Sequence, residues 1–171
     1  MNINIRPIEP ADLNALLTIE NASFPEPWEV QDFKTSLNES NNVGCLAETH
    51  CEVVGYLIYR LEESQYSIVS MAVAPHVRRQ GIGRMMFEKL IFNRIAFEKL
   101  VLRLNPLKRT QIVLTASEQN LDAHLFFQAL GFKAVEVLWD FYGPGHDGYD
   151  FVYNTGTPYK YKRLDEACQG K

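Results

Sequence analysis

Cysteine is scarce in this chain of 171 residues, and its spacing excludes two kinds of structural cross-link. Cys45, Cys51 and Cys168 are too few for a disulfide framework, and no two of them form the Cys-x-x-Cys pair typical of zinc sites. The N-terminal residues lack the apolar core of a signal peptide, and no apolar run approaches the roughly 20 residues of a membrane helix. We therefore expect a cytoplasmic protein with free thiols, no metal and no membrane contact.

An excess of positive charge is also missing. The chain has 17 Lys and Arg against 21 Asp and Glu, a net charge of −4, so no broad basic surface favours nucleic acid, and direct binding to it is not expected. Apolar residues are plentiful at 46%, enough for a folded core, and the length suits one domain. We expect that domain over residues 1–154 and a C-terminal tail over 155–171, where the composition changes.

Hydrophobic periodicity and helix-breaking residues predict the order of the elements. Strands are expected over residues 3–5, 43–48, 52–61, 66–74, 111–116, 134–142 and 149–154. Helices are expected from residue 10 to about 20 and over 29–37, 82–104 and 121–130. This order predicts a mixed α/β sheet with one central strand–helix–strand unit and a hairpin on either side of it.

The junction of the fourth strand and the third helix carries a candidate binding site for an anion. Gly81 and Gly83, spaced by one residue at the start of a helix, allow the backbone and its free N–H groups to approach a phosphate. Arg78, Arg79 and Arg84 add positive charge. A Walker loop and a dinucleotide fingerprint are both unlike this stretch, since neither Gly-Lys-Ser/Thr nor a third glycine follows. A tight turn without a ligand would explain the two glycines equally well.

Three strings of residues together resemble one protein family. Arg78-x-x-Gly81-x-Gly83 after Val73-Ala74-Pro75 resembles the acetyl-CoA pyrophosphate motif of the GCN5-related N-acetyltransferases. Asn120-x-x-Ala123-x-x-Phe126-Phe127-x-x-Leu130-Gly131-Phe132 is similar to the second cofactor helix of that family. Phe24-x-x-Pro27-Trp28 with Phe33 and Leu37 resembles its ribosomal-protein-alanine N-acetyltransferase (RimI-like) branch. The resemblance runs in order from about Ile5 to Tyr153.

The resemblance implies a fold and an activity. The fold would be a single domain with a largely antiparallel central sheet, split at the strand that meets the cofactor, and flanking helices. The activity would be transfer of an acetyl group from acetyl-CoA to the α-amino group of a protein or peptide N-terminus, with a ribosomal protein as one candidate. Acetylation of a small amine and acyl-CoA binding without turnover remain alternatives, and the sequence does not predict the oligomeric state.

The resemblance also implies roles for individual residues around acetyl-CoA. The backbone of the fourth strand would pair with the pantetheine arm, the amides of the glycine loop would hold the pyrophosphate, and Asn120 would meet the cofactor near its pantetheine. The implied cofactor-binding residues are Met71, Ala72, Val73, Arg79, Gln80, Gly81, Ile82, Gly83, Arg84 and Asn120. An ordinary core strand would account for Met71–Val73 just as well.

The sequence departs from the RimI-like pattern at both catalytic side chains. Thr115 stands where that branch usually has a glutamate base, and Phe127 stands where the family has a tyrosine acid. A positioned acid or base accelerates a reaction by about 10²–10⁴-fold, so their loss slows an enzyme without removing the effect of orienting two substrates. An acceptor that is already partly neutral at pH 7, such as an α-amine, suits a weakened site.

Two tyrosines are candidates to replace the missing groups. Tyr66 at the start of the cofactor strand matches a catalytic tyrosine of some eukaryotic N-terminal acetyltransferases, and Tyr142 matches a substrate-facing position of the branch. A half-buried tyrosine at a sheet edge is the simpler explanation of either. Phe24 and Trp28, with Tyr142, are candidates to line the groove for the acceptor, and plain packing would explain both aromatic rings equally.

Overall fold

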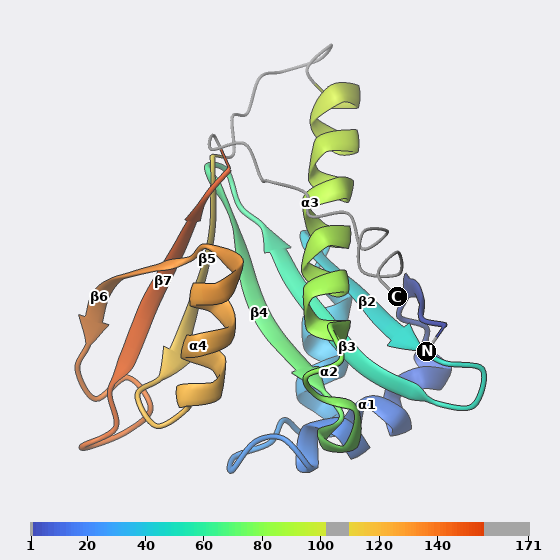
Figure 1. The fold of residues 1–171 in the computed structure, drawn as a ribbon, viewed down its shortest axis with the longest axis horizontal. Helices are drawn as coiled ribbons and strands as arrows, with labels where there is room; N and C mark the ends of the chain where they lie inside the picture. Colours follow the sequence, from blue (N-terminus) through green and yellow to red (C-terminus); the bar gives the residue numbers. More distant parts are fainter. Residues whose placement is uncertain (1, 102–109, 156–171) are drawn as a thin grey trace, which may run out of the picture.

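Seven strands form one mixed sheet in the computed structural model, which describes residues 2–101 and 110–155, with side chains described outside 94–101 (Figure 1). Their order across the sheet is β1-β2-β3-β4-β5-β7-β6. The bounds are β1 Asn4–Pro7, β2 Asn42–Glu48, β3 Val53–Leu61, β4 Gln65–Val73, β5 Gln111–Ser117, β6 Lys133–Leu138 and β7 Gly148–Asn154.

Helices cover both faces of this sheet (Figure 1). They are α1 Leu13–Asn21, α2 Val30–Asn38, α3 Ile82–Val101 and α4 Leu121–Leu130, with short 3₁₀ turns at Pro10–Asp12 and Pro75–Val77. On one face, Phe33 of α2 packs edge-on against Tyr56 of β3 at 5.5 Å between ring centroids. On the other face, Phe87 of α3 packs against Tyr153 of β7 at 5.4 Å. Within the described ranges, no helix combines the length and the apolar character that crossing a bilayer requires.

The sheet is split between β4 and β5. Every other neighbouring pair is antiparallel, whereas β4 and β5 are parallel and stay in register only over Gln65–Ser67 and Gln111–Val113. Beyond that short ladder the two strands diverge (Figure 1). In β4 the register against β3 also shifts at Val69, between the pairs Ile58↔Ser70 and Tyr59↔Ile68, and such a bulge bends its strand. The predicted split of the sheet is confirmed.

The predicted order of elements is confirmed, and most bounds agree within about two residues. One hairpin differs, because β6 ends at Leu138 and not at residue 142. Asp140 has a φ of 53°, and its carboxylate accepts a hydrogen bond from the backbone N–H of Gly145 at 2.5 Å. This local folding turns Trp139 to Tyr142 into part of a longer loop. The predicted end of the third helix beyond Val101 lies outside the described residues.

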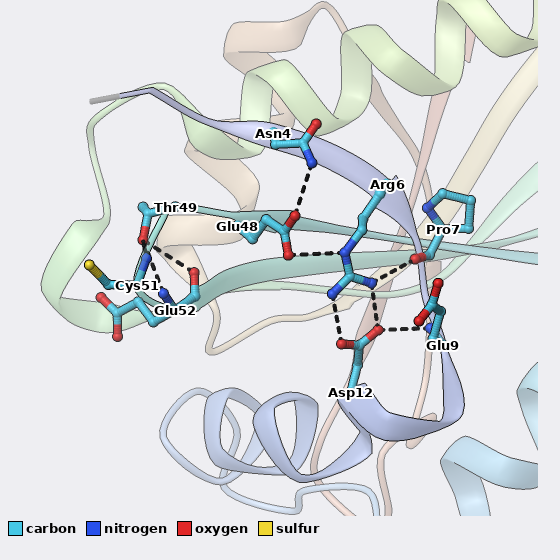
Figure 2. Close-up of polar contacts among 9 residues, drawn as sticks. All are labelled: Asn4, Arg6, Pro7, Glu9, Asp12, Glu48, Thr49, Cys51 and Glu52. Atoms are coloured by element: carbon cyan, nitrogen blue, oxygen red, sulfur yellow. Dashed lines mark hydrogen bonds and ion pairs between the residues drawn. The ribbon is translucent and has the colours of Figure 1, made fainter.

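Arg6 joins three elements at the N-terminal edge of the sheet (Figure 2). Its guanidinium donates to both carboxylate oxygens of Asp12, at 2.7 and 2.8 Å, and to Glu48 of β2 at 2.9 Å. Asn4 donates to the other oxygen of Glu48 at 2.9 Å. The guanidinium beside Asp12 holds the pKa of that carboxyl below its usual range. Arg6 therefore fixes the start of the first helical segment against β1 and β2.

We expect Arg6→Met to lower the free energy of unfolding by about 1–2 kcal/mol, because Asp12 and Glu48 lose their hydrogen bonds from the guanidinium. The effect stays this small because both ion pairs are partly exposed to water. Asp12 has a lowered pKa in the folded chain, so its contribution is complete above its unfolded value of about 3.9 and disappears as the pH falls through the lower folded value. Urea titrations between about pH 3 and pH 7 should show this acid loss in the wild type and a smaller one in the variant. Arg60→Met, which removes the more exposed pair with Glu39, is the matched control and should cost less. An equal loss in both variants would contradict a special role for Arg6.

Candidate active site

A cavity of about 330 Å³ lies where β4 and β5 separate. Its walls come from the end of β4, the loop into α3, the first turn of α3, the α1–α2 loop and one side of α4. The lining residues are Ser23, Phe24, Met71, Ala72, Val73, Val77, Arg78, Arg79, Gly81, Ile82, Gly83, Arg84, Asn120, Asp122, Ala123, Phe126 and Phe127. The cavity therefore extends from the helix pair α3 and α4 to the α1–α2 loop on the other face.

The glycine loop shapes one end of the cavity. Gly81 has a φ of 85° and Arg79 a φ of 62°, so the chain passes through two left-handed residues just before α3 begins at Ile82. A Cβ on Gly83 would lie 2.9 Å from the ring of Phe126 and 3.4 Å from the end of Met71. The first N–H groups of a helix have no partner within it and carry the positive end of its dipole. This end of the cavity suits an anion.

The three arginines near the glycine turn all have partners within the protein, and Arg84 in the first turn of α3 donates to the backbone carbonyl of Ala129 at 3.3 Å. Arg78 donates to the carbonyl of Val73 and to the hydroxyl of Ser23, both at 2.9 Å, so it ties the α1–α2 loop to β4. Arg79 pairs at 2.5 Å with Asp122 of α4, and both side chains are more than 70% exposed. An anion entering the cavity would compete with Asp122 for Arg79. Arg78 therefore has a structural role in addition to lining the cavity, and the charge that it would offer a ligand stays a prediction.

The predicted cofactor residues gather around this one cavity, with a single exception. Gln80 is not among the lining residues, whereas the other nine are. Asn120 has a second role, because its side-chain oxygen caps α4 by accepting from the backbone N–H of Ala123 at 3.1 Å. Its oxygen is thus committed to the helix.

Two of the predicted catalytic positions lie together on the face of the sheet that carries α1 and α2. The hydroxyl of Thr115 donates to a carboxylate oxygen of Asp150 on β7 at 2.5 Å, and the hydroxyl of Tyr142 donates to the backbone carbonyl of Thr115 at 3.2 Å. Burial and the charge of Asp150 raise the pKa of Tyr142. Sequence reasoning missed Asp150, because only the strand register β5–β7 brings it beside Thr115.

Tyr66 does not belong to this group. It lies in the closed part of the β4–β5 ladder opposite Ile112, is 1% exposed, and does not line the cavity. Its ring packs 6.5 Å from that of Tyr59, which faces α3 through a hydrogen bond to Asn93. Tyr66 thus points into the core on the side opposite to Thr115. Its hydroxyl is buried away from the cavity, so a catalytic role for Tyr66 stays a prediction that the burial of its side chain disfavours.

The aromatic candidates divide between the cavity and the packing around it. Phe24 and Phe127 line the cavity, and Phe127, 7% exposed, packs edge-on against Phe132 at 5.3 Å. Trp28 is not a lining residue, and its ring packs edge-on against Phe33 at 5.2 Å. Tyr142 also lies outside the cavity, in the exposed loop between β6 and β7. Phe24 thus borders the cavity directly, while Trp28 holds its loop.

The buried carboxylate of Glu20 holds the α1–α2 loop in place near Trp28. Glu20 of α1 is 2% exposed, accepts a hydrogen bond from the backbone N–H of Trp28 at 3.0 Å, and accepts a short one from the hydroxyl of Tyr56. Tyr56 also contacts the hydroxyl of Ser70 on β4 at 2.9 Å. Burial, together with Glu20, raises the pKa of Tyr56. In the sequence, the only indication that Glu20 is buried was its place at helical spacing among apolar residues.

Comparison with known proteins agrees with this geometry. Residues 13–132 match the family described as the acetyltransferase (GNAT) family, which is more than half of the chain. The chain belongs to this family. This acetyltransferase is 27% identical over 163 residues to an N-alpha-acetyltransferase of Sulfurisphaera tokodaii, covering 85% of its own chain and 89% of that protein. A second N-alpha-acetyltransferase, from Saccharolobus solfataricus, is 26% identical over 150 residues, covering 81% and 84%.

Solved structures show the same fold. The ribosomal-protein-S18-alanine N-acetyltransferase from Escherichia coli has a TM-score of 0.74 at 20% identity, with 90% of this acetyltransferase and 94% of that chain covered. Naa20 of Chaetomium thermophilum in complex with a bisubstrate analogue has a TM-score of 0.73 at 23% identity, with 94% and 93% covered. The predicted fold class and family are confirmed. The family uses acetyl-CoA as its acetyl donor.

Proposed function

We propose that this acetyltransferase transfers the acetyl group of acetyl-CoA to the α-amino group of a protein N-terminus. The observation that carries the proposal is the cavity in the split sheet, since it joins a helix N-terminus suited to phosphates with the loop of Phe24 on the other face. Acetyl-CoA supplies an activated thioester and binds, in this proposal, along Met71–Val73 and the loop over residues 79–84. The acceptor approaches from the face of α1 and α2. Relatives named N-alpha-acetyltransferases support this class of acceptor.

The residues of the cavity favour this cofactor for physical reasons. Beyond Ser67, β4 is no longer paired with β5, so its backbone groups on that side are available to an extended ligand. Gly83 lets the ring of Phe126 pack directly against the start of α3, and Ile82 starts the helix whose free N–H groups suit a pyrophosphate. If the pyrophosphate displaced Asp122 from Arg79, the guanidinium of Arg79 would form one charge-assisted hydrogen bond to the cofactor.

The test is a measurement of free thiol released from acetyl-CoA in the presence of peptides with free N-termini, peptides with only a lysine amine, and small amines. The proposal expects release with the first group, and mass spectrometry should place the acetyl group on the first residue. Release with small amines alone would favour a small-molecule acetyltransferase. Tight binding of acetyl-CoA without release from any amine would favour a binding module, for which the substitutions at Thr115 and Phe127 are the observation in favour.

Phe127→Tyr should raise turnover on an accepted peptide by about tenfold or more, because it adds a phenol in the cavity where the family has its acid. The ring already packs against Phe132, so one added oxygen at a cavity wall changes little else. The measurement compares kcat of the variant and of the wild type at saturating acetyl-CoA. Phe132→Tyr, a matched phenol in the core beside it, is the control and should give no gain. A fall in kcat for Phe127→Tyr would show that the sulfur leaves in another direction.

A further inference from the structure

A carboxylate lies beside the position where the RimI-like branch usually has its base. Thr115 of β5 and Asp150 of β7 are register partners, so their side chains share one face of the sheet, and the Thr115 hydroxyl donates to Asp150 at 2.5 Å. Asp150 is only partly exposed. A carboxylate is therefore present one strand away from Thr115, the position of the family's base. The role inferred for it below rests on the proposed function.

The direction of this hydrogen bond matters for what Thr115 can do. A hydroxyl has one proton and two lone pairs. Since the proton of Thr115 is donated to Asp150, the oxygen of Thr115 has only acceptor capacity left for a further partner. An amine N–H is such a partner. Thr115 and Asp150 thus form a two-step path along which a proton can leave an amine.

The position of Thr115 relative to the split supports this path. Thr115 is two residues beyond Val113, the last residue of β5 that pairs with β4, so it lies on the open part of the split. Its backbone is held by the hydrogen bond from Tyr142. Tyr142 and Glu136, the exposed register partner of Asp150 on β6, also face Asp150, and Lys133 lies on the same face beside Val152. Thr115 is the neighbour of Asp150 that is closest to the split.

We propose that Asp150 is the final proton acceptor of the acetyl transfer and receives the proton through the hydroxyl of Thr115. The lone pair of the neutral amine attacks the acetyl carbonyl carbon, a C–N bond forms, and the C–S bond breaks with its electron pair going to sulfur. The N–H proton passes to the oxygen of Thr115 while the proton of Thr115 passes to Asp150. The products are the amide, the CoA thiolate and a protonated Asp150.

Asp150→Asn keeps the shape and an oxygen that accepts from Thr115 but removes the basic carboxylate. It should lower kcat by about 10²-fold, with binding of acetyl-CoA unchanged because Asp150 does not line the cavity. The ratio of wild-type kcat to the kcat of Asp150→Asn should fall between about pH 6 and about pH 9, because hydroxide and buffer base increasingly accept the proton in place of the carboxylate. Structural damage would give the same ratio at every pH. Asp150→Glu should restore part of the rate. Glu136→Gln, the matched loss of an exposed carboxylate one strand farther from the split, should stay within about twofold of the wild type.

Two variants of Thr115 test the relay itself. Thr115→Val removes the hydroxyl at nearly constant volume and should lower kcat as much as Asp150→Asn, while Thr115→Ser should keep most of the rate. Independent of turnover, an ultraviolet titration of Tyr142, identified by subtraction of Tyr142→Phe, should show a lower pKa in Asp150→Asn, since Asp150 is one cause of the raised value. An unchanged Tyr142 titration would overturn the arrangement of the three groups.

The outcomes for this inference and for the proposed function are distinguishable. All rates are measured on whichever amine the wild type acetylates. Wild-type kcat in Asp150→Asn would overturn the role of Asp150 and leave the N-terminal function standing. Acetylation of small amines only, with a large loss in Asp150→Asn, would overturn the N-terminal function and support Asp150. No acetylation of any amine would overturn both.

Discussion

Gly83→Val should weaken the binding of acetyl-CoA by at least about 100-fold, which corresponds to about 2.7 kcal/mol. Even a single Cβ at this position would lie 2.9 Å from the ring of Phe126, well inside ordinary contact, and valine adds two further carbons. These atoms would push Phe126 and Met71, which both line the cavity, out of their places beside the proposed cofactor. Isothermal calorimetry with acetyl-CoA measures the loss, and a thermal melt shows whether the chain is folded.

A double variant separates lost space from general damage. Gly83→Ala alone should weaken binding, and Phe126→Ala should remove the ring that the new methyl group meets. The combined variant should therefore bind acetyl-CoA more tightly than Gly83→Ala, a non-additive result expected of residues in contact. Unchanged affinity in Gly83→Val would contradict this position for the cofactor.

Peptides with a free α-amine should be acetylated about 10²-fold faster than matched lysine peptides with blocked N-termini at pH 7. An α-amine with a pKa of about 7.7–8.0 is roughly one tenth neutral or more at this pH, while a lysine amine with a pKa near 10.4 is neutral in fewer than about one molecule per thousand. Without the family's glutamate at Thr115, the enzyme depends more on amine that is already neutral. The measured quantity is kcat/KM for the two peptides at subsaturating concentration.

The ratio should also change with pH in a defined direction. Raising the pH above about 8 completes deprotonation of the α-amine while the neutral fraction of lysine continues to grow tenfold per unit, so the preference should narrow. The same peptide with both amines free is the internal control, because mass spectrometry reads both sites in one reaction. A lysine rate equal to the α-amine rate at pH 7 would show that the site deprotonates lysine efficiently and would contradict this reasoning.

Most residues predicted to bind the cofactor line one cavity because they are neighbours in the chain. The end of β4, the turn through Gly81 and the first residues of α3 form one continuous segment, and local conformation places them at one end of the cavity. Side-chain partners were less predictable. Arg78 was expected to add charge for a ligand, and the structure adds its hydrogen bonds to Val73 and Ser23, which form because the α1–α2 loop returns to β4 only in the folded chain.

The positions of the predicted catalytic residues depended on strand register and on the face of each strand. Tyr66 was a candidate by resemblance and Thr115 by its place at the family's base position, but the β4–β5 ladder directs Tyr66 into the core towards α3, while Thr115 lies on the opposite face. Tyr142 was placed in a strand by its apolar neighbours, yet the left-handed Asp140 puts it in a loop where its hydroxyl reaches Thr115.

The sequence by itself determined the order of elements, the family and the glycine turn ahead of α3, because hydrophobic periodicity and a glycine-rich helix start act over a few residues. By resemblance, it also predicts that Thr115 and Phe127 replace the two catalytic side chains of the family. Only the tertiary structure decided that Asp150 lies beside Thr115. The two are 35 residues apart, and their contact follows from the pairing of β5 with β7, which a strand's alternation of apolar residues leaves undetermined.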